Sequence, residues 1–329
     1  AIVNEDLPDQ TRISFGYDHE DSELKYAREI AEKYRTKHVE IHVQKEDLVS
    51  GILLITPFLV VPFADTSTLP QFEICKAARK NLTVVLSGDV GDELFGGYNF
   101  YKVENELKKH FSYQNVIAQF GLKLYQNLKQ TSYLSQKNIQ YSSILDFHQN
   151  DVRNFFNENE RRQLGINESY SQPYSFKADE NSLNDIMRTD LEKYVPGNML
   201  VKSDRMAMAN SLEVRTPFLD IDFAEFCIQL PDQLKINSEQ DKIILRESMN
   251  SYWTETIRNR RKQGFGLGIE NWFEEKNLMK FSDDHLKNKD QKIFKYIDFH
   301  ETQKFLNKDR KHWNLLQLAL WAEKKYSQV

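Results

Sequence analysis

The chain has 329 residues, of which 40% are hydrophobic and 28% charged, and its formal net charge is −5. These values are typical of a globular protein, and acids and bases are mixed along the sequence, which excludes the basic face of a general nucleic-acid-binding protein. No apolar run approaches the roughly 18 residues that a membrane span requires. Cys75 and Cys227 lie far apart in apolar contexts, which favours buried thiols in a reducing, cytoplasmic compartment over a disulfide.

The first hundred residues predict alternating strands and helices. Residues 11–17 and 38–43 alternate between apolar and polar side chains, as strands do, and residues 22–34 between them carry apolar residues at helical spacing. Strand, helix and strand at this spacing form a βαβ unit, which implies a parallel sheet with a right-handed crossover. A helix over 71–80 and a strand over 82–86 extend the same layer.

The stretch from Val84 to Tyr98 carries the most informative pattern in the chain. Three apolar residues lead into a turn that holds four glycines and three acids within ten residues. A strand that ends this way delivers carboxylates and backbone N–H groups to the carboxyl edge of a sheet, where α/β folds bind ligands. The alternative is a surface turn whose acids point to water, and the density of glycines and acids behind an apolar strand favours the ligand site.

After Tyr98 the strand signal nearly vanishes, and the remaining elements are expected to be helical. Residues 101–165 show helical patches, and the later helices are expected over 183–195, 198–210, 222–230, 240–251 and 313–326. We expect the first of these to stop at Pro196-Gly197, because proline disrupts a helix interior. The sequence therefore predicts an α/β layer over 1–100 and a mainly helical remainder over 101–329.

Three ordered motifs resemble the synthetase domain of glutamine-dependent asparagine synthetases, and the resemblance extends from about residue 11 to 275. They are Leu86-Ser87-Gly88-Asp89-Val90-Gly91-Asp92-Glu93-Leu94-Phe95-Gly96-Gly97-Tyr98; Lys202-Ser203-Asp204-Arg205-Met206-Ala207-Met208-Ala209 continuing into Leu212-Glu213-Val214-Arg215-Thr216-Pro217-Phe218-Leu219-Asp220; and Arg261-Lys262-Gln263-Gly264-Phe265 with Trp272 downstream.

The resemblance implies an α/β fold with a parallel sheet of the adenine nucleotide α-hydrolase-like (ATP pyrophosphatase) type and a large helical C-terminal extension. Such domains use ATP and Mg²⁺ to adenylate a carboxylate, release pyrophosphate and let ammonia attack the acyl-adenylate. The default reaction is aspartate to asparagine, with ammonia from a glutaminase domain upstream or in another chain. The expected partners are thus a small-molecule carboxylate, the ammonia source and a second copy in a homodimer, with no nucleic acid and no membrane.

Within the first motif, the resemblance implies a nucleotide and metal site. Asp92 is the expected Mg²⁺ ligand, because Mg²⁺ prefers carboxylate and phosphate oxygens; without the motif, a helix N-cap explains Asp92 equally well. Ser87 and Gly88 are expected to offer backbone groups to the nucleotide, since a larger side chain at position 88 would block a close approach. Phe15 ends the first strand, where the family uses a main-chain contact to adenine; an ordinary core aromatic is the alternative.

Cations in the second and third motifs are expected to neutralise the departing pyrophosphate. Lys202, Arg205 and Lys262 have this role by resemblance, because cations placed where charge develops stabilise a transition state. For each of them the alternative is a solvated surface charge. Glu213 and Arg215 are expected either to form a buried ion pair that shapes the acceptor pocket or to hold a helix end.

Asp89 departs from the family pattern, because asparagine synthetases usually have glutamate at this position. That residue is assigned to handling the reacting ammonia or the acyl-adenylate, and Asp89 is the expected catalytic group here. Aspartate is shorter by one methylene, and a misplacement of about 1 Å can cost roughly a hundredfold in rate. Asp89 is thus expected to serve a different acceptor or to sit on a shifted backbone, and a plain turn acid is the alternative.

The family's pyrophosphate loop, Ser-Gly-Gly-x-Asp-Ser, does not occur in this sequence. The loop belongs before the 11–17 strand, so the expectation is that the chain is part of a longer polypeptide and that residues 1–329 alone show no ligase activity. A natural short protein is the alternative. We further expect the strands at 11–17 and 82–87 to flank a gap or a strand contributed by another segment, rather than to hydrogen-bond directly to each other.

Three functions compete at this point. The first is ATP-dependent amidation of aspartate. The second keeps the chemistry and changes the acceptor to a sugar acid, a peptide or a β-lactam precursor, which the aspartate at position 89 favours. The third is a catalytically inactive scaffold, which the absent loop favours and the presence of Asp92, Arg205 and Lys262 opposes.

Overall fold

The computed structural model describes residues 11–16, 24–42, 48–102, 156, 158–166, 183–260 and 272–327. Most of the helical patches expected within 101–165 lie outside these ranges. One short helix, α9 (Glu158–Gln163), falls inside them.

The strands form two parallel pairs. Strand β1 (Thr11–Gly16) pairs with β2 (Lys37–His42), and helix α2 (Leu24–Lys33) connects them, which confirms the βαβ unit. Strand β3 (Val84–Leu86) pairs in parallel with β4 (Glu213–Arg215). Among the described residues, β1 and β3 belong to separate two-stranded sheets and do not pair with each other, as expected.

Strand β4 was not expected, since the sequence predicts no strand after Tyr98. Its three residues contain one apolar side chain, Val214, and so show no period that a sequence reading can detect. Val214 stands opposite Val85 in the strand register and packs with it against a buried cluster that includes Cys75 and Leu212. The strand therefore forms because β3 offers a partner, not because of local propensity.

Three consecutive helical segments form one continuous run through the middle of the molecule. Helix α10 (Leu183–Thr189) leads into a π-helical segment, η4 (Asp190–Met199), and this leads directly into α11 (Leu200–Met208). The expected stop at Pro196-Gly197 is therefore wrong. A proline ring clashes with the carbonyl four positions back in an α-helix, and the wider π turn relieves this clash and lets the chain continue.

The largest apolar core lies among the helices at the end of the chain and one early helix. This core packs α3 (Leu48–Ile55) against α17 (Lys276–Leu286) and α19 (Arg310–Ser327). Helix α18 (Phe299–Gln303) lies between the last two in the sequence. The helix expected over 313–326 is thus confirmed as α19. Trp313, Leu316, Ala319 and Leu320 are all buried, and Trp313 meets Trp272 edge to face with ring centroids 5.2 Å apart.

The remaining elements are short connectors and helices around the strands. They are η2 (Thr56–Phe58), α4 (Thr68–Arg79), α5 (Gly91–Phe95), η5 (Pro217–Leu219), α12 (Ile221–Gln229), α13 (Asp232–Lys235), α14 (Ile243–Ser248), α15 (Glu255–Arg258) and η6 (Lys292–Lys295).

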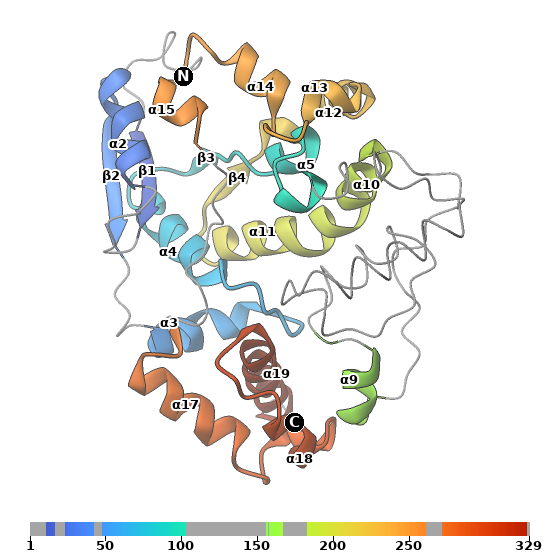
Figure 1. Ribbon diagram of the computed structural model, residues 1–329. Coiled ribbons are helices and arrows are strands. Elements are labelled where there is room, and N and C mark those ends of the chain that lie inside the picture. The colour runs from blue at the N-terminus through green and yellow to red at the C-terminus, as the bar shows by residue number, and fades with distance from the viewer. Residues whose placement is uncertain are drawn as a thin grey trace, which may run out of the picture.

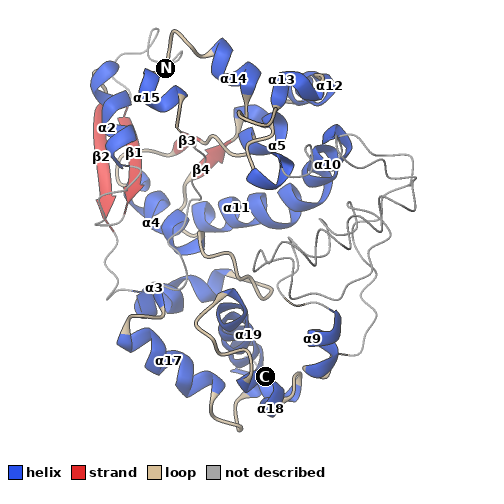
Figure 2. Cartoon of the chain, viewed as in Figure 1, coloured by secondary structure: helices blue, strands red, loops and turns tan. Residues whose placement is uncertain are grey.

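The elements divide into two regions in space. Figure 1 shows the four strands with α2, α5, α10 and α12 to α15 in the upper part, and α3, α17, α18 and α19 in the lower part. Helices α4 and α11 lie between these regions, and Figure 2 shows that helices dominate both. None of the helices in the described ranges has the length and apolar character needed to cross a bilayer.

Candidate active site

The acidic turn follows β3 and opens helix α5. Ser87 continues the strand by donating its backbone N–H to the carbonyl of Arg215 at 2.9 Å. Val90 then takes a left-handed conformation with φ of 73° and is fully buried, although β-branched residues avoid this region. Strain of this kind persists only where the surroundings fix the backbone, and it is common at functional turns.

The space around Gly88 is open, as its expected role beside a nucleotide requires. A Cβ atom built at Gly88 would meet no atom within 4 Å. Packing among the described residues therefore does not require glycine here, which leaves room for a ligand to approach the backbone. This observation supports the expected role of Gly88.

Two hydroxyl groups donate to the Asp89 carboxylate, and a third contacts one of them. Oδ2 of Asp89 accepts hydrogen bonds from the hydroxyls of Ser87 at 2.9 Å and Ser203 at 3.1 Å. The Ser87 hydroxyl also lies 3.2 Å from that of Thr216, just after β4. The turn after β3, the end of β4 and helix α11 thus meet at Asp89.

Asp92 lies in the first turn of α5 and forms an ion pair. Its Oδ1 is 2.6 Å from the ammonium of Lys242, and both side chains are largely buried. The helix begins after Val90, which occupies the N-cap, so the N-cap alternative for Asp92 is wrong. A Cβ at Gly97 would lie 1.9 Å from Asp92 Oδ1 and 2.3 Å from Lys242 Cε, so this pair requires glycine at position 97.

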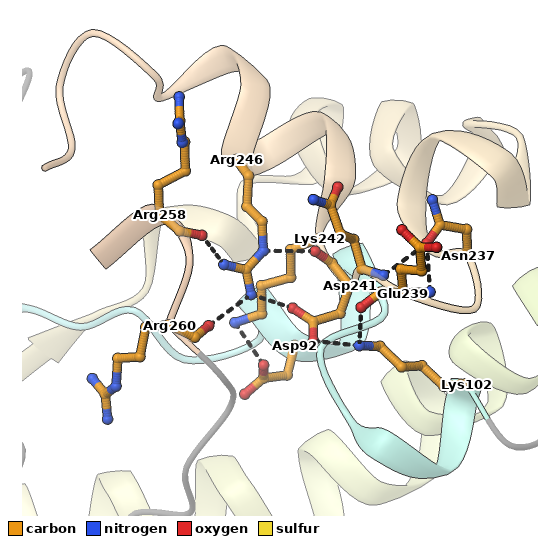
Figure 3. A network of polar contacts seen from close by, with 10 residues as sticks. Asp92, Lys102, Asn237, Glu239, Asp241, Lys242, Arg246, Arg258 and Arg260 are labelled. Atoms are coloured by element: carbon orange, nitrogen blue, oxygen red, sulfur yellow. Dashed lines mark hydrogen bonds and ion pairs between the residues drawn. The ribbon is translucent and has the colours of Figure 1, made fainter. Parts of the chain in front are cut away.

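A larger polar network extends from this ion pair. Figure 3 shows Arg246 between Asp241 and the backbone carbonyls of Arg258 and Arg260. Asp241 is 5% exposed and also pairs with Lys102 at 3.1 Å. This network fixes the start of α14, and therefore the backbone of Lys242, relative to α15.

The expected cations have different surroundings. The Lys202 ammonium lies 3.1 Å from Asp65 Oδ2 and 2.6 Å from the Ser67 hydroxyl. Burial acts to raise the pKa of Asp65, but Lys202 and Ser67 outweigh it and hold that pKa below its ordinary value. Arg205 has a buried guanidinium nitrogen, Nη1, with no hydrogen-bond partner among the described residues. Lys262 lies outside the described residues.

Helix α11 presents these groups on different faces. Lys202 and Arg205 are three residues apart and share one face of the helix, whereas Ser203, which contacts Asp89, projects from a neighbouring one. An arginine is always charged, and a buried donor without a partner is costly. The Nη1 of Arg205 therefore suits an anion that approaches this face.

Two further predictions concern residues outside the acidic turn. Phe15 lies in β1, opposite Ile41 in the register, and so belongs to the other sheet from Ser87; its side chain is outside the described part of the chain. Glu213 and Arg215 do pair, at 2.7 Å, but their side chains are 53% and 64% exposed. The expected buried pair is wrong, because alternate residues of β4 point to its solvent face.

Two further carboxylates, on α5 and η4, are fully buried. Glu93 is fully buried and accepts a 2.6 Å hydrogen bond from the Tyr98 hydroxyl. Burial raises the pKa of Glu93 to about 7, with a smaller contribution from Asp190 and Asp92. Asp190, at the start of η4, is also fully buried and accepts a hydrogen bond from Tyr101 at 2.5 Å.

The sequence reading did not identify Ser203, Thr216 or Lys242 as site residues. Ser203 and Thr216 lie inside the quoted motifs, so their positions were available, but a serine or threonine alone indicates no partner. Lys242 lies 150 positions from Asp92 in the sequence, and only the steric need for Gly97 connects them. No local pattern in the sequence reveals such a contact.

The site can be tested for its fit to a metal and a polyphosphate. In the described part of the chain, no three or more histidine, cysteine, aspartate or glutamate side chains are grouped to hold a metal ion. Mg²⁺ at nucleotide sites commonly uses one or two carboxylates and takes its other ligands from phosphates and water. Asp92 is a single carboxylate of this kind, with Oδ1 held 2.6 Å from Lys242, and the buried Nη1 of Arg205 fits an anion.

Comparisons with known proteins show similarity to asparagine synthetases. The family model described as asparagine synthase matches residues 1–323. The chain is 26% identical to asparagine synthetase [glutamine-hydrolyzing] 1 of Bacillus subtilis, over 99% of the chain and 54% of that protein. It is 27% identical to a putative asparagine synthetase [glutamine-hydrolyzing] of Mycobacterium bovis, over 86% of the chain and 45% of that protein.

A more distant relative has a different name. The chain is 24% identical to amidase chry2 of Gibberella zeae, over 69% of the chain and 39% of that protein. The chain spans about half the length, or less, of these curated relatives.

Proposed function

The chain belongs to the asparagine synthase family, and from this membership we propose that it catalyses ATP-dependent amidation of a carboxylate through an acyl-adenylate. The default acceptor is aspartate, and the product is asparagine. The ammonia comes from glutamine hydrolysis in a separate domain or chain, as the names of the relatives suggest. We further propose that residues 1–100 belong to an α/β layer of the ATP pyrophosphatase type and that 101–329 form the rest of the synthetase domain.

One observation carries this proposal. A carboxylate held by hydroxyl donors, Asp89, and a carboxylate in contact with a cation, Asp92, follow the same strand within one short turn. The carboxyl edge of parallel strands is where α/β folds bind ligands, and Gly88 leaves the turn open to one.

The chemistry assigns a role to each group. In the first step, an acceptor carboxylate oxygen attacks the α-phosphorus of ATP, and the bond to pyrophosphate breaks. Asp92 would hold Mg²⁺, which would neutralise the phosphates when bound. Lys202, Arg205 and Lys262 would stabilise the charge that moves onto pyrophosphate, with Lys242 as a further cation beside Asp92.

The second step forms the amide. The ammonia nitrogen attacks the acyl carbon, the bond to AMP breaks, and the nitrogen must lose a proton. Asp89 would accept that proton, and general-base catalysis of this kind typically contributes about 10²–10⁴-fold. Ser87 and Gly88 would offer backbone groups to the nucleotide, and Phe15 would offer its main chain to adenine.

A different acceptor is the second candidate. The likeness to a protein named as an amidase and the aspartate at position 89 both favour it. The chemistry of the two steps stays the same, and only the carboxylate differs.

The experiment measures pyrophosphate release and amide formation by the full-length protein with Mg·ATP, an ammonium salt and either aspartate or a panel of sugar acids and peptides. We expect Asp92→Asn to lower acceptor-dependent pyrophosphate release by about 10²-fold or more, because the variant loses the charge that holds the metal. Asp283→Asn, which removes an exposed pair with Lys287, is the matched control. Unchanged release in folded Asp92→Asn protein would remove Asp92 from the site, and no release with any acceptor would refute the ligase proposal.

A further inference from the structure

Ser203 has a hydrogen bond that its position in a helix does not explain. It lies within α11 and is 5% exposed. A serine in a helix interior usually turns its hydroxyl back to the carbonyl four residues earlier or out to solvent. The Ser203 hydroxyl instead donates to Asp89 Oδ2, 114 positions away, at 3.1 Å.

The hydroxyl protons around Asp89 can be assigned by counting donors. Each hydroxyl has one proton, and those of Ser87 and Ser203 both go to Asp89 Oδ2. The Ser87 oxygen is then an acceptor for Thr216, 3.2 Å away. Two protons are thus directed to Asp89 Oδ2, and the third, from Thr216, goes to the Ser87 oxygen, where it polarises the bond from Ser87 to the carboxylate.

This arrangement makes the two oxygens of Asp89 different. Oδ2 is occupied by two donors, whereas Oδ1 accepts no hydrogen bond from the residues that the structure describes. Donors from two separate elements, the turn and α11, fix the rotation of the carboxylate. Ser87 alone cannot do this, because it is only two residues away and moves with the turn.

We propose that Ser203 is a positioning residue that orients the Asp89 carboxylate, so that Oδ1 faces the reacting amine; this role rests on the function proposed above. Ser203 itself touches no reacting atom. Its contribution is to hold the base still while the acyl-adenylate and ammonia meet. Because it acts only through Asp89, its removal changes the amide-forming step and leaves nucleotide binding unchanged.

The test compares Ser203→Ala with Ser203→Thr in the full-length protein, using aspartate, Mg·ATP and an ammonium salt. We expect Ser203→Ala to lower kcat for amide formation by about tenfold to a hundredfold, the cost of misplacing a catalytic group by up to about 1 Å. The KM for ATP is expected to stay within about twofold of the original value, since Ser203→Ala leaves the groups assigned to the nucleotide in place. Ser203→Thr keeps the hydroxyl and is expected to restore most of the rate.

A double-mutant cycle separates positioning from a general structural effect. In an Asp89→Asn background, with product measured over hours by mass spectrometry, Ser203→Ala is expected to change the rate less than about twofold, because the base it orients is gone. Ser282→Ala is the matched control: it removes another buried serine hydroxyl, 2.7 Å from His312, in the lower region. That control is expected to lower the melting temperature without changing kcat.

The outcomes are distinguishable. A normal rate in Ser203→Ala, or an equal loss in both backgrounds, overturns the positioning role while leaving the ligase proposal intact. Original protein that forms no amide from any acceptor refutes the proposed function and this role with it. If Ser203→Ala does not fold, Ser203→Cys takes its place, and because a thiol is a weak donor, a rate equal to the original overturns the proposal.

Discussion

The upper and lower regions of the molecule bury ionisable groups of different type, carboxylic acids in the upper region and an imidazole in the lower one. The upper region, which carries the acidic turn, buries the carboxylic acids Glu93 and Asp190. The lower region, around the largest apolar core, buries the imidazole of His312 together with the Ser282 hydroxyl. Burial disfavours charge in both regions, so it raises the pKa of Glu93 to about 7 and lowers that of His312 to about 4.

From this difference we propose that the upper region carries the chemistry and that the lower region mainly contributes stability. In the upper region, groups such as Asp92, Asp241 and Lys242 depend on exact charge partners, and breaking a buried pair leaves an uncompensated charge. In the lower region, most buried side chains are apolar, and their contribution scales with the area removed from water. The predictions below test this division.

The largest expected effect is on Asp89. Asp89→Ala removes the proposed base, so amide formation should fall by about 10²–10⁴-fold while ATP binding stays largely intact. Rates of product formation and a nucleotide-binding titration measure the two effects separately. A change of less than a few-fold would make Asp89 a plain turn residue. Asp89→Glu, the family's usual residue, adds a second measurement: faster asparagine formation would favour aspartate as the acceptor.

The sequence predicted elements whose signal is local and missed those that depend on distant partners. The βαβ unit and α19 follow from periodic apolar residues, and both are confirmed. Strand β4 has three residues and depends on β3, so no alternating pattern in the sequence predicts it. The helix over Pro196 continued because a π turn accommodated the ring, and a propensity argument assumes an α-helix.

The same distinction holds for the candidate site. The acidic turn can be predicted because its glycines and acids fall within ten residues of sequence, and the structure gives Asp89 and Asp92 specific partners. Lys242 and Ser203 were missed because their partners lie more than a hundred positions away. Lys262 lies outside the described residues, so its role stays a prediction.

A pair of core truncations compares the two regions directly. Leu94 on α5 and Leu316 on α19 are both fully buried leucines, so each change to alanine should lower the free energy of unfolding by about 2–5 kcal/mol. Only Leu94→Ala should also lower kcat in folded protein, because α5 carries Asp92. Urea melts and rate measurements on the same samples test this. Equal effects on kcat would mean that the regions are not functionally separate.

Glu93 predicts a pH dependence of stability in the upper region. Its pKa is raised to about 7 from an ordinary value of 4.5, mainly by burial. Between these values the folded state binds a proton that the unfolded state has lost, so stability falls as pH rises through this window. Glu93→Gln keeps an acceptor for Tyr98 and cannot ionise. The original protein should lose on the order of 3 kcal/mol of unfolding free energy between pH 4.5 and 7 through Glu93, and this variant should not. Urea melts at both ends of the window measure the difference. The same pH dependence of stability in both proteins would show that Glu93 is not its source.

His312 predicts the opposite dependence in the lower region. Its ring stacks on Phe273 with centroids 4.2 Å apart, and its Nδ1 accepts the Lys308 backbone N–H at 3.2 Å. The proton of the neutral ring is therefore on Nε2, where it can be donated to Ser282. A second proton would have to go to Nδ1 and break the bond to Lys308.

Burial lowers the pKa of His312 from 6.5 to about 4, with opposing contributions from Asp309 and Asp283. Between these values the unfolded state binds a proton that the folded state excludes, so stability falls as pH drops from about 6.5 to 4. His312→Asn should be less stable at pH 7.5, because it loses the stacked ring, but should lose about 1–3 kcal/mol less than the original protein on acidification. Urea melts at pH 7.5 and 4.5 give this difference. An identical acid loss in both proteins would assign the effect to other groups, and the lower region would then share the carboxylate-dominated behaviour of the upper one.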